Sequence, residues 1–194
     1  MDKISYALGV NIAESLKQQG FSLKSYADFT AAVKDVYEGN VQLKPEEIGE
    51  VLNTEFTRVQ ENVHKVKVDE GAAFLEENAK RNEITVLSSG LQYEILTEGK
   101  GPIPSADDTV TTHYHGTLPN GTVFDSSVQR GQPASFPVSG VIKGWVEALQ
   151  LMPTGSKWRL YVPSDLAYGA QGAGKEIGPH QALVFEVELL EINK

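Results

Sequence analysis

Residues 140–153 have the sequence GVIKGWVEALQLMP, in which a tryptophan follows a glycine at the start of an apolar run. The run is shorter than an ordinary helix, since helices in globular proteins average about 11 residues. Pro153 ends it, because proline has no amide to donate inside a helix. The stretch therefore predicts a helix of barely two turns, with the bulky Trp145 close to its amino-terminal end.

Short segments of alternating polar and apolar residues flank this helix from about residue 88 onward. Alternation between turns of glycine, proline and asparagine is typical of strands. PNGT at 119–122 predicts a hairpin with a two-residue turn. The expected strands lie in LQYEILTEG, DDTVTTHYHGTL, TVFDSS, ASFPVS, KWRLYVP and ALVFEVELLEI. We therefore expect a C-terminal antiparallel sheet packed on one short helix, of the α+β class.

In the first 43 residues the apolar residues do not alternate with polar ones but fall at helical spacings. After a first helix, a second is expected between a serine cap, Ser22 or Ser25, and a stop at Gly39. Two helices of this size bury too little apolar surface to be stable alone. We therefore expect residues 1–43 to pack against a second copy of the chain. The alternative is that they fold back on the other half as an ordinary helical cap.

A long helix is expected to follow these two. Pro45 suits its first turn, where the missing amide has no partner to lose. Apolar residues recur in steps of four and three up to Val66, which is the spacing of paired helices. Beyond Val66 most side chains are charged or small, so we expect a solvated stalk. The predicted division is a helical dimerisation module at 1–43, a connecting helix at 44–83 and a sheet domain at 84–194.

Composition excludes several classes of function. The chain has 194 residues, a net charge of −9 and 40% hydrophobic residues, so it is globular and unsuited to nucleic acid or an anionic membrane surface. It has no cysteine, which excludes thiol chemistry and zinc sites built on thiolates. MDKISYALGV has no signal-peptide pattern, so we expect a cytoplasmic protein. The alternative is the periplasm, if a leader has been removed.

The sequence has few motifs of metal, phosphate or nucleophile chemistry. No nucleophile elbow, P-loop or dinucleotide fingerprint occurs. A strand would place His113 and His115 on one face, but two ligands do not close a metal site. The same alternation turns Tyr114 toward the core. We therefore interpret the two histidines as a solvated strand face, and expect no metal and no cofactor.

Aromatic residues with a few polar groups gather in the sheet half. They form either an ordinary aromatic core or a concave apolar pocket for a small ligand. The unusual member is Asp125, because a carboxylate beside core aromatics needs a partner. Arg130 or a tyrosine hydroxyl could supply one. The group comprises Tyr114, Phe124, Asp125, Phe136, Trp145, Tyr168 and Phe185.

Three stretches carry a family resemblance. They are VTTHYHGTLPNGTVFDSS, FPVSGVIKGWVEALQLMPTGSKWRLYVPSDLAYG and PHQALVFEVELLEI. Together they resemble the FKBP family of peptidyl-prolyl cis/trans isomerases. The helical half, through SYALGVNIAESLK, resembles the amino-terminal dimerisation module of bacterial FKBPs of the macrophage infectivity potentiator type. This second resemblance implies a homodimer through the N-terminal helices.

The resemblance also implies the site. Trp145 matches the floor of the proline pocket, and the Ile142 amide and Tyr168 hydroxyl match donors to a bound peptide. Two roles stay open for Asp125, which either acts on the surroundings of the twisted carbonyl or orients Tyr114. The implied catalytic residues are Asp125, Tyr168, Tyr114 and Trp145. The implied substrate-binding residues are Phe124, Arg130, Phe136, Val141, Ile142, Ile177 and Phe185.

The implied function is rotation about X-Pro bonds in folding proteins, with chaperone activity through a dimeric cleft. The partners would be proline-containing unfolded or partly folded polypeptides, and macrolide inhibitors are the implied small ligands. Ala134 replaces a common phenylalanine and Gly178 a common proline, which should weaken macrolide binding more than isomerase activity. The alternative is a non-catalytic chaperone or peptide-binding module, and a third hypothesis is a scaffold that joins partners through its long helix.

Overall fold

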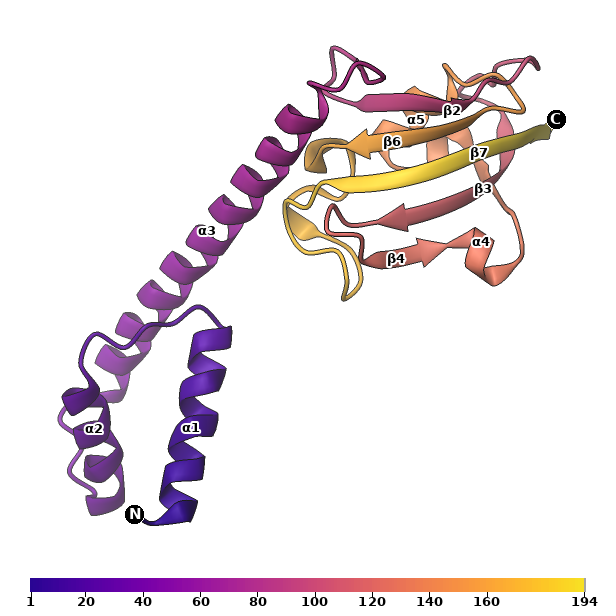
Figure 1. The fold of residues 1–194 in the computed structure, drawn as a ribbon. Coiled ribbons are helices and arrows are strands. Elements are labelled where there is room, and N and C mark those ends of the chain that lie inside the picture. The colour runs from indigo at the N-terminus through magenta and orange to yellow at the C-terminus, as the bar shows by residue number, and fades with distance from the viewer. Residues whose placement is uncertain (194) are drawn as a thin grey trace. The chain divides into compact units, whose positions relative to one another are not determined.

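The computed structural model describes residues 1–193, and the chain divides into two compact units between Lys65 and Val66. Helix α3 (Pro45–Asn78) contributes residues to both units (Figure 1). None of the helices in the described part of the chain is long and apolar enough to cross a membrane.

The unit that ends at Lys65 contains α1 (Lys3–Gln18), α2 (Tyr26–Glu38) and the first turns of α3. The Ser25 hydroxyl accepts a hydrogen bond of 3.2 Å from the amide of Asp28, so Ser25 rather than Ser22 caps α2. Gly39 ends α2 with φ of 70°, a left-handed conformation that glycine adopts without a steric penalty. The three expected helices and their expected start signals are thus confirmed.

This helical unit has almost no interior of its own. Val59 is the only apolar side chain buried among residues 1–65, at 5% exposed, although Phe21 and Phe56 also stack edge to face with centroids 4.7 Å apart. Other large apolar side chains lie open to solvent, including Leu8 at 59% and Tyr37 at 88% exposed. The apolar stripes that predicted the helices are therefore not covered within a single chain.

The second unit is built on one seven-stranded antiparallel sheet in the order β1-β2-β6-β7-β3-β4, with β5 also paired to β3. The six expected strands are confirmed, and β1 is a short addition at the edge. The strands are β1 (Thr85–Val86), β2 (Gln92–Thr97), β3 (Thr109–Thr117), β4 (Val123–Ser126), β5 (Ala134–Pro137), β6 (Lys157–Val162) and β7 (Leu183–Asn193).

The turn between β3 and β4 corrects the expected two-residue hairpin. The amide of Gly121 donates to the carbonyl of Leu118 at 2.9 Å, and the amide of Leu118 donates to the carbonyl of Thr122 at 2.8 Å. The loop therefore has three residues, with a positive φ of 86° at Gly121. Pro119 is the physical reason, because its fixed φ near −65° suits the first central position of a type I turn closed by a left-handed glycine.

Helix α5 (Lys143–Leu149) confirms the predicted two-turn helix and packs on one face of the sheet (Figure 1). Trp145 is its third residue and is buried with Ala148 and Leu149. The neighbouring Gly144 lies so close to β6 that an added Cβ would be 2.6 Å from Cγ1 of Val162. The core between helix and sheet is completed by Val110, Tyr114, Leu160, Val162, Leu183, Phe185, Val187 and Leu189.

The last turns of α3 correct the expected solvated stalk. The ring centroid of Phe74 lies 6.1 Å from that of Tyr161 on β6. The buried Asn78 donates to the side-chain oxygen of Gln92 at 2.9 Å, and the Gln92 amide group donates to the carbonyl of Leu75 at 2.8 Å. The helix ends at Asn78, earlier than expected, because its final turn is tied to β2 and β6 rather than left in solvent.

Replacing Gly144 by alanine should lower the free energy of unfolding of this unit by about 1–3 kcal/mol, because the new methyl group would overpack the contact with Val162. The measurement is urea unfolding followed by tryptophan fluorescence, since Trp145 and Trp158 both lie in this unit.

Gly71→Ala is the matched control in the same unit. Its Cβ would lie 3.6 Å from that of Ala182, an ordinary contact. It should therefore stabilise α3 by up to about 1 kcal/mol through helix propensity. Equal unfolding midpoints for Gly144→Ala and the unmodified chain would contradict the close packing of α5 on β6.

Candidate active site

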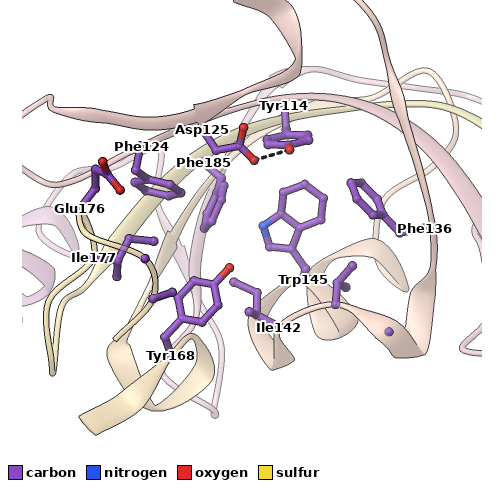
Figure 2. Close-up of a pocket in the computed structure, with 14 residues that line it drawn as sticks. Tyr114, Phe124, Asp125, Phe136, Ile142, Trp145, Tyr168, Glu176, Ile177 and Phe185 are labelled. Atoms are coloured by element: carbon purple, nitrogen blue, oxygen red, sulfur yellow. Dashed lines mark hydrogen bonds between the residues drawn. The ribbon is translucent and has the colours of Figure 1, made fainter. Parts of the chain in front are cut away.

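A cavity of about 670 Å³ opens between the sheet, α5 and the loop that precedes β7 (Figure 2). This volume lies within the range of small-ligand pockets, and the lining is mostly apolar with a few polar groups. It is lined by Tyr114, Phe124, Asp125, Phe136, Gly140, Val141, Ile142, Trp145, Tyr168, Ala173, Gly174, Glu176, Ile177 and Phe185.

Trp145 forms the floor of this cavity and is 4% exposed. Three rings meet it edge to face. Its centroid lies 5.5 Å from that of Tyr114, 5.9 Å from that of Phe136 and 5.3 Å from that of Phe185, with interplanar angles of 82–89°. Such edge contacts are favourable and hold the indole in one orientation. The floor is therefore a rigid aromatic surface.

Gly116 on β3 leaves room for the ring of Phe124, which forms one wall of the cavity. A Cβ at Gly116 would lie 2.7 Å from the ring of Phe124 and 3.0 Å from that of Phe185. These two rings pack edge to face, with centroids 5.4 Å apart. Any larger residue at position 116 would push Phe124 off the sheet, so the glycine fixes the position of this wall.

Asp125 at the end of β4 is part of a hydrogen-bonded cluster at the edge of the cavity. It accepts hydrogen bonds from the hydroxyl of Tyr114 and from the guanidinium of Arg130. Arg130 also donates to the Tyr114 hydroxyl at 2.8 Å, and its guanidinium carbon lies 5.6 Å from the centre of that ring. The sequence context required one partner for the carboxylate, and both of the candidates, Arg130 and a tyrosine hydroxyl, donate to it.

The cluster also fixes the ionisation of its members. Burial alone would raise the pKa of Asp125, but the hydrogen bonds from Tyr114 and Arg130 outweigh it and hold that pKa below its ordinary value. Burial, followed by the hydrogen bond to Asp125, raises the pKa of Tyr114. At neutral pH the site therefore holds an ionised carboxylate and a protonated phenol.

Two donors face the cavity from its rim. Tyr168 is partly exposed, and its hydroxyl points into the cavity in Figure 2. The amide of Ile142 donates to no acceptor within residues 1–193, since this residue precedes the first turn of α5. An apolar floor with free donors at its edge can hold a ring and hydrogen-bond the carbonyls on either side of it.

The structure brings almost all of the predicted site residues together around the cavity. Only Arg130 does not line it, and it acts on the cavity through Asp125 and Tyr114. Ala134 packs partly buried against the core and does not line the cavity. Sequence reasoning did not place Gly140, Ala173, Gly174 or Glu176 in the site. No motif marks Ala173, Gly174 or Glu176, which lie in the loop that precedes β7.

The two histidines on β3 lie on the opposite side of that strand from Tyr114. The Nδ1 atom of His113 is 3.1 Å from the hydroxyl of Ser127, and that of His115 is 2.9 Å from the hydroxyl of Ser126. Within the described residues, no group of three or more histidine, aspartate or glutamate side chains could hold a metal ion.

Comparison with known proteins gives one consistent result. Residues 101–190 match the family of FKBP-type peptidyl-prolyl cis-trans isomerases, and residues 1–95 match the domain amino-terminal to such isomerases. The FKBP-type 22 kDa peptidyl-prolyl cis-trans isomerase of Escherichia coli is 44% identical over 97% of this chain and 93% of its own. Peptidyl-prolyl cis-trans isomerase Mip of Coxiella burnetii is 41% identical over 100% of this chain and 87% of its own.

A solved structure extends the match to the fold. The crystal structure of FkpA from Escherichia coli superposes with a TM-score of 0.76 and 36% identity. The superposition covers 98% of this chain and 93% of FkpA. The similarity therefore includes the helical unit as well as the sheet.

Proposed function

The chain belongs to the FKBP-type peptidyl-prolyl cis-trans isomerases, and we propose that the cavity above Trp145 is where it accelerates rotation about X-Pro bonds. The observation that supports this proposal is the aromatic floor itself, a buried indole framed by three rings at the base of an open apolar cavity. A flat apolar surface of this kind suits the ring of a substrate proline.

The reaction needs a particular environment rather than a reactive group. Rotation about a peptide bond meets a barrier of roughly 18–20 kcal/mol, because the planar amide loses its resonance in the twisted state. No covalent bond breaks, so neither a nucleophile nor a metal is required. The planar amide has a larger dipole than the twisted one, so a dry cavity destabilises the ground state more than the transition state. Such differential binding accelerates a step.

We propose that the residues at the rim of the cavity orient the substrate. With the proline ring on Trp145, the Ile142 amide and the Tyr168 hydroxyl would donate to carbonyls of the flanking peptide. Val141 and Ile177 would pack against its apolar atoms, with Phe124, Phe136 and Phe185 as the walls. The peptide on either side of the bond would thus be held while the bond rotates. Macrolide inhibitors would occupy the same cavity.

The cluster of Asp125, Tyr114 and Arg130 is the polar part of the proposed machinery. Because the carboxylate is ionised and accepts from both partners, it fixes the Tyr114 hydroxyl at the edge of the cavity. Two roles are compatible with this geometry. Asp125 either acts on the twisted carbonyl through its own charge or serves only to position Tyr114.

Asp125→Ala should lower kcat/KM for a short Leu-Pro peptide about tenfold, equivalent to about 1.4 kcal/mol of transition-state binding. The measurement is the cis-to-trans relaxation rate. Asp107→Ala is the control, because Asp107 is exposed and lies outside the cavity. If Asp125 only positions Tyr114, Tyr114→Phe and the double variant will show the same loss as Asp125→Ala. An unchanged rate in Asp125→Ala would contradict the proposed role of the cluster.

We further propose that the helical unit forms a homodimer. Its support is the open apolar surface of α1 and α2, neither of which buries a single residue within the chain. Contiguous apolar surface of this kind marks an association site. A second copy of the same unit offers matching stripes, and helices this short need such a partner for stability. The apolar faces would then be covered.

A dimer would present two cavities to a single polypeptide substrate. Two weak contacts on a single unfolded chain raise the overall affinity, because the second binding event becomes intramolecular. We therefore propose that the physiological substrates are proline-containing, partly folded polypeptides, and that capture of such chains gives the protein a chaperone activity. Short peptides, which reach only one cavity, would gain nothing from the dimer.

Leu8→Glu should convert the dimer into a monomer, because it places a charge in the centre of the exposed apolar stripe of α1. Sedimentation equilibrium measures the mass. The monomer should keep the rate on a Leu-Pro peptide while losing most of its acceleration of a proline-limited refolding reaction. Asn11→Glu, at an exposed polar position of the same helix, should remain a dimer. A monomeric wild-type chain would contradict the proposal.

A further inference from the structure

Glu176 is a charged residue in the wall of the cavity that the proposed mechanism does not use. Asp125 and Glu176 are the only charged side chains that line this cavity in the described part of the chain. The first of these is neutralised by its ion pair with Arg130. Glu176 has no ion-pair partner within 4 Å among residues 1–193. The cavity wall therefore carries one uncompensated negative charge.

The backbone around Glu176 is held in place. Ala173 and Ile177 form an isolated bridge, with reciprocal amide-to-carbonyl bonds of 2.8 and 3.1 Å. Ile177 is 8% exposed and belongs to the apolar core. Gly172 allows the tight approach, because a Cβ there would lie 2.3 Å from the carbonyl oxygen of Ile177. The position of the residue next to Ile177 is thus fixed by a closed loop.

The carboxylate itself is exposed at the edge of the cavity. Its Oε2 atom accepts a 3.2 Å hydrogen bond from the amide of Lys175. Figure 2 shows Glu176 beside Phe124 and Ile177, on the other side of the cavity from Phe136. A peptide whose proline lies on Trp145 would pass this carboxylate with a residue that flanks the proline.

We propose that Glu176 is a specificity-determining residue that favours substrates with lysine or arginine directly before or after the proline and disfavours substrates with glutamate or aspartate there. The inference rests on the proposed function, because it assumes that the proline occupies the floor formed by Trp145. A long basic side chain can lay its apolar stem on Phe124 and Ile177 while its charge reaches the carboxylate. An acidic side chain would meet a like charge beside a low-dielectric wall.

The size of the effect follows from the exposure of the carboxylate. Exposed ion pairs are individually weak and are screened by salt. We therefore expect a lysine-containing peptide to exceed its glutamate counterpart about three- to tenfold in kcat/KM at low ionic strength. The ratio should fall below about twofold at 1 M salt, where the screening length is about 3 Å. A preference set by shape alone would not respond to salt.

The test compares relaxation rates of two series of short peptides, with lysine, leucine or glutamate either before or after the proline. At least one series should show the lysine preference in the full-length wild-type chain. Glu176→Gln should bring the lysine-to-glutamate ratio close to one, and Glu176→Lys should invert it. The control Glu98→Gln removes the same charge from an exposed position outside the cavity and should retain the wild-type ratio.

The outcomes separate the inference from the function on which it rests. If the wild-type chain does not accelerate the leucine peptides, the proposed catalytic cavity itself is wrong. If the leucine peptides are accelerated but lysine and glutamate peptides react equally in both series, only the role of Glu176 is overturned. An equal loss of preference in Glu98→Gln would also overturn it, because the preference would then come from the net charge of −9.

Discussion

The packing of Trp145 determines both the core of the second unit and the shape of its cavity. Trp145 can reach the centre of the fold only because α5 is two turns long and lies against the sheet, with Gly144 almost in contact with β6. Three rings from β3, β5 and β7 then fix its edges. The core and the proposed substrate site share this side chain, so packing that stabilises the fold also keeps the proposed catalytic floor rigid.

The polar groups of the site are arranged around that floor with little freedom. Asp125 remains ionised because Tyr114 and Arg130 donate to it, and the three side chains form one hydrogen-bonded cluster at the edge of the cavity. The helical unit differs, because the apolar faces of its helices remain exposed to solvent within one chain. We thus propose that the cavity of the second unit carries out isomerisation, and that the open apolar surface of the helical unit supports capture of a polypeptide by forming a dimer.

Sequence patterns predicted the local structure well where one signal dominated. Alternation located the strands, and Ser25, Gly39 and Pro45 marked helix ends by their capping chemistry. The hairpin prediction failed because Pro119 overrode the Asn-Gly signal. The end of α3 was predicted as solvated because its attachment to the sheet depends on the amide side chains of Asn78 and Gln92 and on one isolated aromatic residue, Phe74, which hydrophobic periodicity does not detect. Composition alone could not tell which aromatic residues line a pocket and which only fill the core. The family resemblance identified the pocket residues. It did not identify Glu176, because this residue lies in a loop without a motif.

The proposed position of the substrate proline on Trp145 can be tested by an NMR measurement of contacts between a bound Leu-Pro peptide and the two tryptophans. Nuclear Overhauser effects are expected between the proline ring protons and the indole of Trp145. None should involve Trp158, whose ring stacks on Tyr93 with centroids 4.2 Å apart and does not line the cavity. Contacts from the proline ring to other residues, without any to Trp145, would contradict the central claim that this indole is the floor of the catalytic site.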